Sequence, residues 1–277
     1  MIIGLIAVVF STSILMKDNK TVSLFSWENQ VYQENQIDKL FGLMNQLSVT
    51  RLYQQFPNEG INTNDILTLL QRADESNIDV YYLTGDGTWG LDEMAVDMKT
   101  KIDEIDILNH TSAKEFPIKG IYFDVETYLT EQWIQNPKES FNNYVNAMVT
   151  GYRYAKSKGL RVIVCIPNWL DEVNIDSLDN LIQYACDEIA IMNYDKRNEI
   201  NAIKEEVLLS KKYHKNLECI FEFQKEGYHQ LTSNETYYTD GLDVAMHNFD
   251  LLRDYYQDAS ISFAYHYVNP LYEILER

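Results

Sequence analysis

Downstream of residue 20, the chain alternates short apolar segments with longer segments in which apolar residues recur at helical spacing. Continuous apolar segments of about four to eight residues are typical of parallel strands that are covered on both faces. Eight segments have this character and are predicted to be strands: Val22–Ser26, Val49–Tyr53, Asp79–Leu83, Gly120–Asp124, Leu160–Ile166, Glu188–Met192, Glu218–Phe223 and Ile261–His266.

The segments between these strands have the apolar periodicity of amphipathic helices. The predicted helices are Gln36–Gln46, Thr63–Ser76, Asp92–Leu108, Ser140–Lys158, Ile175–Tyr184, Ile200–Tyr213 and Gly241–Tyr256. Regular alternation without a glycine-rich phosphate loop favours closure of the sheet over an open doubly wound arrangement. The sequence therefore predicts an α/β fold, a single (β/α)8 TIM barrel over residues 21–277.

The N-terminus has a different pattern. Met1–Met16 contains no charged side chain, and Lys17 and Lys20 follow it closely. The run is shorter than the roughly 20 residues of a transmembrane helix and suits the apolar core of a signal peptide. We expect residues 1–20 to be a signal peptide or membrane anchor, although a buried first strand is the alternative. The protein is then secreted, or anchored through residues 1–16 to the extracellular face of a membrane.

Charge and composition narrow the partners. The chain has 23 Lys and Arg against 42 Asp and Glu, a net charge of −19. Such a surface repels phosphates, so nucleic acid is not expected as a partner. Cys165, Cys186 and Cys219 are widely spaced in or beside apolar runs and resemble small buried residues rather than metal ligands. We predict no metal site and no cofactor.

Polar and aromatic residues follow the predicted strands, and the carboxyl ends of barrel strands are where ligand chemistry gathers. Carboxylates in this position are typical of enzymes that cleave glycosidic bonds, and Trp and Tyr offer flat faces that suit sugar rings. We therefore expect a carbohydrate, either a polysaccharide or an oligosaccharide, as the partner. The candidate substrate-binding residues are Trp27, Trp89, Asn168, Trp169, Asp195 and His266.

The most informative segment runs from Lys119 to Glu126 (KGIYFDVE). Asp124 and Glu126 are two residues apart on an extended chain, so both side chains point to the same side, toward the barrel axis or mouth. Two neighbouring carboxylates raise one another's pKa, which can keep one of them protonated as a general acid. The alternative is a pair of solvated loop acids, or one acid that pairs with a neighbouring Lys or Arg.

This segment resembles the fourth-strand signature DGxDxDxE of the chitinase-like glycoside hydrolase family 18. Asp124 and Glu126 match its last two acids, whereas Lys119 and Tyr122 stand where the family has aspartates. The segment around Met192–Asp195 (MNYD) is similar to the family's MxYD stretch. The chain also resembles a group of uncharacterised exported bacterial barrels with a related DxEP-type strand.

The resemblance implies roles for three residues. Glu126 would be the general acid, and Asp124 would orient the 2-acetamido group of the substrate, whose oxygen acts as the nucleophile. The hydroxyl of Tyr194 would support the resulting intermediate. The implied function is an exported glycoside hydrolase that acts on a glycan containing N-acetylated sugars.

Other hypotheses remain open at this stage. Glu126 and Glu222 resemble the acid/base and nucleophile pair of retaining barrel glycosidases, which form a covalent glycosyl-enzyme. Glu222 is alternatively a structural acid, bonded to Arg51 or to tyrosine hydroxyls. The chain is alternatively a non-catalytic carbohydrate-binding barrel or, with least support, a barrel such as a deacetylase or lyase acting on another bond.

Overall fold

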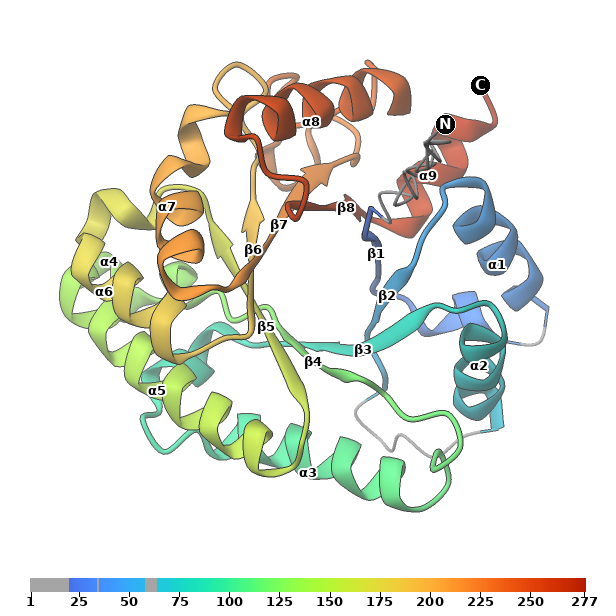
Figure 1. Cartoon of the computed structure of the whole chain (residues 1–277), viewed down its shortest axis with the longest axis horizontal. Helices are drawn as coiled ribbons and strands as arrows, with labels where there is room; N and C mark the ends of the chain where they lie inside the picture. The colour runs from blue at the N-terminus through green and yellow to red at the C-terminus, as the bar shows by residue number, and fades with distance from the viewer. Residues whose placement is uncertain (1–19, 34, 58–63) are drawn as a thin grey trace, which may run out of the picture.

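The strands form one closed parallel barrel in chain order (Figure 1). The computed structural model describes residues 20–33, 35–57 and 64–277, so the predicted membrane-targeting run 1–16 and Thr63 lie outside the described residues. Closure is made by β1 and β8, which pair in parallel through Val22 and Phe263 and through Leu24 and Tyr265. The predicted single (β/α)8 TIM barrel is confirmed.

Each strand lies within two residues of its predicted position. The bounds are β1 (Val22–Ser26), β2 (Arg51–Gln54), β3 (Asp79–Thr84), β4 (Gly120–Phe123), β5 (Arg161–Pro167), β6 (Glu188–Met192), β7 (Asn216–Glu222) and β8 (Ser262–His266). The agreement follows from their burial, because strands covered on both faces are marked by apolar residues along their whole length.

Helices surround the barrel as an outer ring (Figure 1). Their bounds are α1 (Ile37–Gln46), α2 (Asn64–Glu75), α3 (Val96–His110), α4 (Glu131–Gln135), α5 (Pro137–Ser157), α6 (Leu170–Tyr184), α7 (Lys204–Tyr213), α8 (Leu242–Tyr256) and α9 (Val268–Leu275). Short 3-10 helices lie at η1 (Asn29–Tyr32), η2 (Gly87–Leu91), η3 (Thr127–Leu129), η4 (Asn201–Ile203) and η5 (Tyr228–Gln230).

Five helices differ clearly from the sequence prediction. α3 and α7 begin at Val96 and Lys204, four residues later than predicted. α4 and α9 were not predicted, and α6 begins at Leu170 rather than at Ile175. Within α6, Asn174 leaves the helical conformation, with φ −164° and ψ 102°. This kink breaks the apolar period, so the sequence pattern reveals only the part of α6 that follows it.

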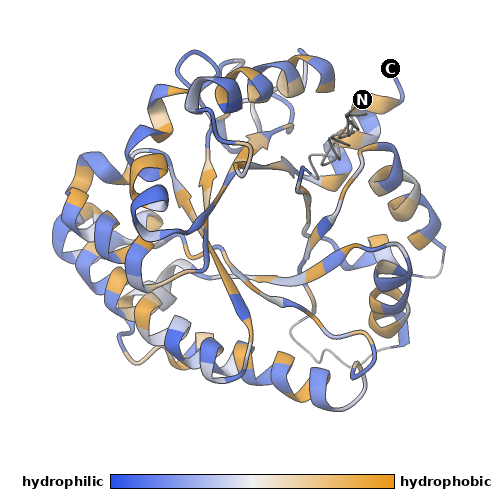
Figure 2. Cartoon of the chain, in the orientation of Figure 1, coloured by the Kyte–Doolittle hydropathy of each residue, from blue (hydrophilic) through white to orange (hydrophobic). Residues whose placement is uncertain are grey.

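Apolar positions concentrate on the strands and on the inner faces of the helices (Figure 2). The barrel interior holds its own cluster of side chains, separate from the layer between strands and helices. At its centre, the ring centroids of Tyr53 and Tyr122 are 4.3 Å apart, and Phe25 lies 5.0 and 5.1 Å from them. The interior is therefore a packed core, as in other barrels of this fold.

A charged layer fills the amino-terminal end of the barrel. Arg51 Nη1 donates to Glu188 Oε1 at 2.7 Å and to the Tyr53 hydroxyl at 2.9 Å. Tyr53 in turn donates to Glu218 Oε2 at 2.8 Å. Burial raises the pKa of Glu218 to about 7, although Arg51 opposes the shift. Because these groups are paired and hydrogen-bonded to one another, their burial avoids the large free-energy cost of an unpaired charge in the protein interior.

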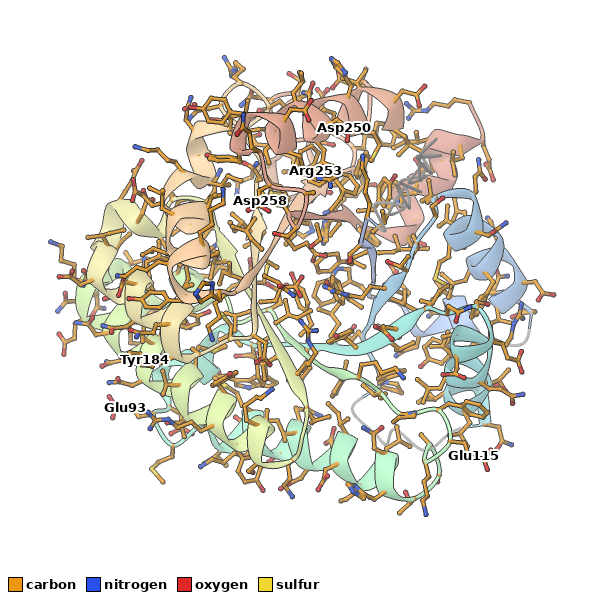
Figure 3. All side chains as sticks on the ribbon, in the orientation of Figure 1. Glu93, Glu115, Tyr184, Asp250, Arg253 and Asp258 are labelled. Atoms are coloured by element: carbon orange, nitrogen blue, oxygen red, sulfur yellow. The ribbon has the colours of Figure 1, made fainter. Side chains whose placement is uncertain are left out.

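Charged and aromatic side chains of the outer surface, including Glu93, Glu115 and Tyr184, extend away from the barrel (Figure 3). Within the described ranges, none of the helices combines the length and apolar character needed to cross a membrane.

Candidate active site

Asp124 is the first residue after β4, and the backbone on both sides of it is tightly constrained. Its N–H donates to the carbonyl of Thr84 at 2.9 Å. Gly85 lies so close that a Cβ added there would be 1.9 Å from the carbonyl oxygen of Asp124. Only glycine permits this approach between the ends of β3 and β4, and it fixes where the Asp124 carboxyl projects.

The Asp124 carboxyl is held in an unusual environment. Burial, and secondarily the charge of Glu126, raise the pKa of Asp124 to about 6, while Cys165 and His266 oppose the shift. Its Oδ1 atom is buried and has no hydrogen-bond partner among the described residues. Asp124 therefore titrates near pH 6, which makes it a candidate functional residue.

Glu126 is positioned by an aromatic neighbour. The hydroxyl of Tyr128 donates a hydrogen bond to Glu126 Oε1. The ring of Tyr128 packs edge-on against Trp169, with centroids 5.3 Å apart, and against Trp133 at 6.5 Å. Trp169, a predicted sugar-binding residue, thus packs against the residue that holds Glu126.

Across the carboxyl-terminal opening of the barrel, which we call the mouth, three side chains from the ends of β1, β7 and β8 are linked by hydrogen bonds. Trp27 Nε1 donates to His266 Nε2 at 3.0 Å, and His266 Nδ1 lies 2.8 Å from Glu222 Oε2. An indole N–H can only donate, so Nε2 must accept and the neutral ring must carry its proton on Nδ1. His266 therefore donates to Glu222.

Glu222 is held as an anion. Its Oε1 accepts the backbone N–H groups of Phe223 at 2.8 Å and Gln224 at 2.7 Å. Burial alone would raise the pKa of Glu222, but His266 and the hydrogen bonds from Gln224 outweigh it and the pKa is lowered. The expected structural partner, Arg51, instead pairs with acids at the opposite end of the barrel because it lies on the first residue of β2.

Tyr194 follows β6 and lies in the same mouth. Its ring centroid is 6.4 Å from that of His266. Burial and the nearby charge of Glu222 raise the pKa of the Tyr194 hydroxyl, which stays protonated. The residues that the structure brings together are Trp27, Asp124, Glu126, Tyr194, Glu222 and His266.

Three other predicted binding residues lie outside this group. Asp195 Oδ1 accepts from Asn234 Nδ2 at 2.7 Å and so ties two loops together. Trp89 lies in η2 and packs against the core between the strands and the helices. Asn168 follows β5 directly and is partly buried.

Sequence reasoning missed two close neighbours of the candidate acids. The register pairs Phe123 with Val164, so the next pair along the two strands is Asp124 and Cys165. The cysteine was predicted only as a small buried residue, although the alternation of β5 places it on the inner side. Tyr128 lies two residues after Glu126. This spacing brings the two side chains together only because the chain turns into the 3-10 helix η3 at Thr127, and the sequence pattern did not predict that helix.

A cavity of about 1120 Å³ lies at the opposite end of the barrel, lined in part by Lys20, Ser48 and Arg51. We assign the candidate site to the other end, because barrels of this fold place their chemistry at the carboxyl ends of the strands. In the part of the chain that the structure describes, no group of three or more His, Cys, Asp or Glu residues is arranged to hold a metal ion.

The fold and the residues at the carboxyl end of the barrel together define a class of protein. It is a TIM barrel with acidic and aromatic side chains clustered just beyond the ends of its strands. No protein-family model matches the chain, and no curated protein matches it. Among solved structures, a chitinase from Bacteroides thetaiotaomicron aligns over 92% of this chain and 93% of its own, with 15% identity and a TM-score of 0.58.

Two further structures have the same barrel. The PgaB (BpsB) glycoside hydrolase domain from Bordetella bronchiseptica aligns over 92% of this chain and 95% of its own, with 11% identity and a TM-score of 0.55. D-psicose 3-epimerase from Clostridium cellulolyticum H10 aligns over 90% and 86%, with 9% identity and a TM-score of 0.55. At these identities the likeness shows the TIM-barrel fold, and the chemistry has to be argued from the site.

Proposed function

We propose that this protein is a glycoside hydrolase that cleaves glycans containing N-acetylated sugars, with the acetamido group of the substrate as the nucleophile. The observation that carries the proposal is the Asp124–Glu126 pair just after β4, where Asp124 is partly buried beside a second carboxyl and titrates near pH 6. Two carboxyls with different environments are what acid catalysis at a glycosidic bond requires.

In the proposed reaction, Glu126 donates a proton to the glycosidic oxygen as the bond to the anomeric carbon breaks. The carbonyl oxygen of the 2-acetamido group attacks that carbon and closes a five-membered ring. Asp124 binds the acetamido N–H and orients the group, and the hydroxyl of Tyr194 supports the developing intermediate. The Glu126 carboxylate then takes a proton from a water molecule, whose oxygen bonds to the anomeric carbon. The bond from that carbon to the acetamido oxygen breaks, which opens the ring and releases the sugar with its acetamido group restored.

The bonding of Glu222 favours this mechanism over a covalent glycosyl-enzyme. Both oxygens of Glu222 already accept hydrogen bonds from the protein, from two backbone N–H groups, from His266 and from Gln224 Nε2 at 3.3 Å. A nucleophilic carboxylate has to direct a lone pair at the anomeric carbon, which these bonds oppose. We assign Glu222 the role of positioning His266.

The first prediction concerns Glu126. Glu126→Gln should lower turnover by about 10²–10⁴-fold, because a positioned proton donor is lost, while folding and sugar binding persist. The measurement is the rate of cleavage of aryl glycosides of N-acetylglucosamine. Glu131→Gln, the same chemical change at an exposed residue of α4, is the matched control and should retain the wild-type rate.

The same assay separates the alternatives. Substrate assistance requires the 2-acetamido group, so glucosides should resist cleavage, and a thiazoline mimic of the cyclised intermediate should inhibit strongly. Cleavage of glucosides, with azide restoring activity to Glu222→Ala, would instead establish the covalent mechanism. Sugar binding without cleavage by the wild-type chain would establish a carbohydrate-binding barrel.

A further inference from the structure

A second concave site lies beside the mouth, over the ends of β7 and β8. It has a volume of about 350 Å³. Its lining includes three tyrosines, two amides and an acid, which are Tyr228, Tyr238, Tyr267, Gln224, Asn269 and Glu273. Because these residues follow β7 and β8 in the chain, the hollow lies at the same end of the barrel as Asp124 and Glu126.

The three tyrosines are presented in different ways. Tyr238 is held in place, since its hydroxyl donates to Glu273 Oε2 at 2.6 Å and the guanidinium of Arg277 lies 4.0 Å from its ring centroid. Tyr267 is half-buried beside His266, with ring centroids 5.3 Å apart. Tyr228 is 62% exposed, so most of the surface of its ring is open to solvent.

Two contacts connect the hollow to the candidate active site. Gln224 both lines the hollow and donates to Glu222. Asn269 lines it and donates through Nδ2 to Glu28 Oε1 at 2.8 Å, at the rim next to Trp27. The residues of the hollow and those of the candidate active site are therefore joined by direct hydrogen bonds.

The chemistry of the lining fits a sugar. Aromatic rings offer flat apolar faces to the C–H groups of a pyranose, and amide and carboxylate groups match its hydroxyls, each of which can donate and accept. The volume is near the lower end of the roughly 300–1,000 Å³ found for ligand sites. It suits one ring better than a length of polymer.

We infer that the hollow formed by Tyr228, Tyr238, Tyr267 and their polar neighbours is a second sugar subsite, which binds another residue of the oligosaccharide held at Glu126. This inference rests on the proposed function for the choice of oligosaccharide. It assigns the loops after β7 and β8 a role in selecting longer chains over short ones.

The test measures binding by calorimetry, using β-1,4-linked di- and hexasaccharides of N-acetylglucosamine and the full chain carrying Glu126→Gln to prevent turnover. Adding Tyr228→Ala should weaken hexasaccharide binding by about tenfold, the upper range for one aromatic contact, and leave disaccharide binding unchanged. Tyr255→Ala is the matched control, because Tyr255 is 63% exposed and lies at the far end of α8. It should alter neither affinity.

Equal hexasaccharide affinity with and without Tyr228→Ala would overturn the subsite, as would an equal loss for both ligands. Binding of neither ligand would also overturn it. Cleavage of the hexasaccharide by the wild-type chain, followed by product analysis, tests the proposed function separately. If the wild type does not cleave but hexasaccharide binding depends on Tyr228, the hydrolase assignment fails and the subsite stands.

Discussion

His266 organises one side of the mouth because its two ring nitrogens have partners that need opposite roles. Nε2 must accept from Trp27, and Nδ1 must donate to Glu222. Burial opposes a charged ring, but the neighbouring charge of Glu222 outweighs it, so the pKa of His266 is raised above 6.5. Asp124 and Glu126 shift it in the same direction.

This arrangement predicts a pH-dependent contact. As the pH falls through the raised pKa of His266, the ring gains a proton on Nε2, which then faces the N–H of Trp27 and breaks their hydrogen bond. The indole N–H signal of Trp27, identified by its loss in Trp27→Phe, should shift in NMR spectra over that range. Glu222→Gln should move the transition to lower pH.

A Trp27 signal that stays constant while His266 titrates would contradict the predicted contact. The positions of His266, at the end of β8, and of Asp124 and Glu126, just after β4, could be predicted from sequence because a buried apolar strand precedes them. The bond from Tyr128 to Glu126 could not, since it depends on how the chain turns after β4. Short turns are set by local backbone geometry that apolar periodicity does not encode.

Among the helices, α7 carries an acid where an apolar residue is expected. Glu206 is fully buried, and neither of its carboxyl oxygens has a hydrogen-bond partner among the described residues. Burial raises the pKa of Glu206 to about 8. The folded chain therefore retains a proton that the unfolded chain loses above its ordinary pKa.

The consequence is a stability that falls as the pH rises. Between about pH 4.5 and 8, this group alone should lower the free energy of unfolding by about 1.4 kcal/mol per pH unit. Glu206→Met should remove that slope and be more stable than wild type at pH 8. Denaturant unfolding of both chains at several pH values measures the difference, and parallel stability curves would contradict the assignment.

Element existence was more predictable than element boundaries. All eight strands are recognisable in the sequence because strands that are buried on both faces consist of nearly continuous runs of apolar residues. α4 has only five residues, too few to display a helical period, and the kink at Asn174 hides the start of α6. Where geometry departs from regular repetition, the pattern of apolar positions carries no corresponding signal.

At the scale of the whole molecule, the barrel interior is sorted into layers. Arg51, Glu188 and Glu218 fill the amino-terminal end, aromatic rings fill the middle, and Asp124 and the other acids of the mouth lie beyond them. The alternation of side chains along parallel strands produces such layers, because residues at equal heights on different strands share one level. The candidate acids are therefore predictable from register once the barrel is recognised, whereas their partners are not.

Cell location is a separate property of the whole chain, and the apolar run Met1–Met16 predicts export. Expressed in a bacterial host, the full chain should fractionate with the membrane or the culture medium. A chain that begins at Thr21 should remain in the cytoplasmic fraction. Recovery of the intact full chain from the cytoplasm, without membrane association, would be evidence against export.

The layering also determines which electrical charge a ligand meets. Arg51 lies at the opposite end of the barrel, so the main negative charges near the site are Glu222 and, above about pH 6, Asp124, and His266 balances them only in part. Such a field stabilises positive charge that develops at an anomeric carbon and repels carboxylate or sulfate substituents. Uncharged saccharides should thus be preferred over uronates and sulfated glycans. This selectivity follows from the position of Arg51 at the amino-terminal end of the barrel, where its positive charge is paired with buried acids and is remote from the ligand.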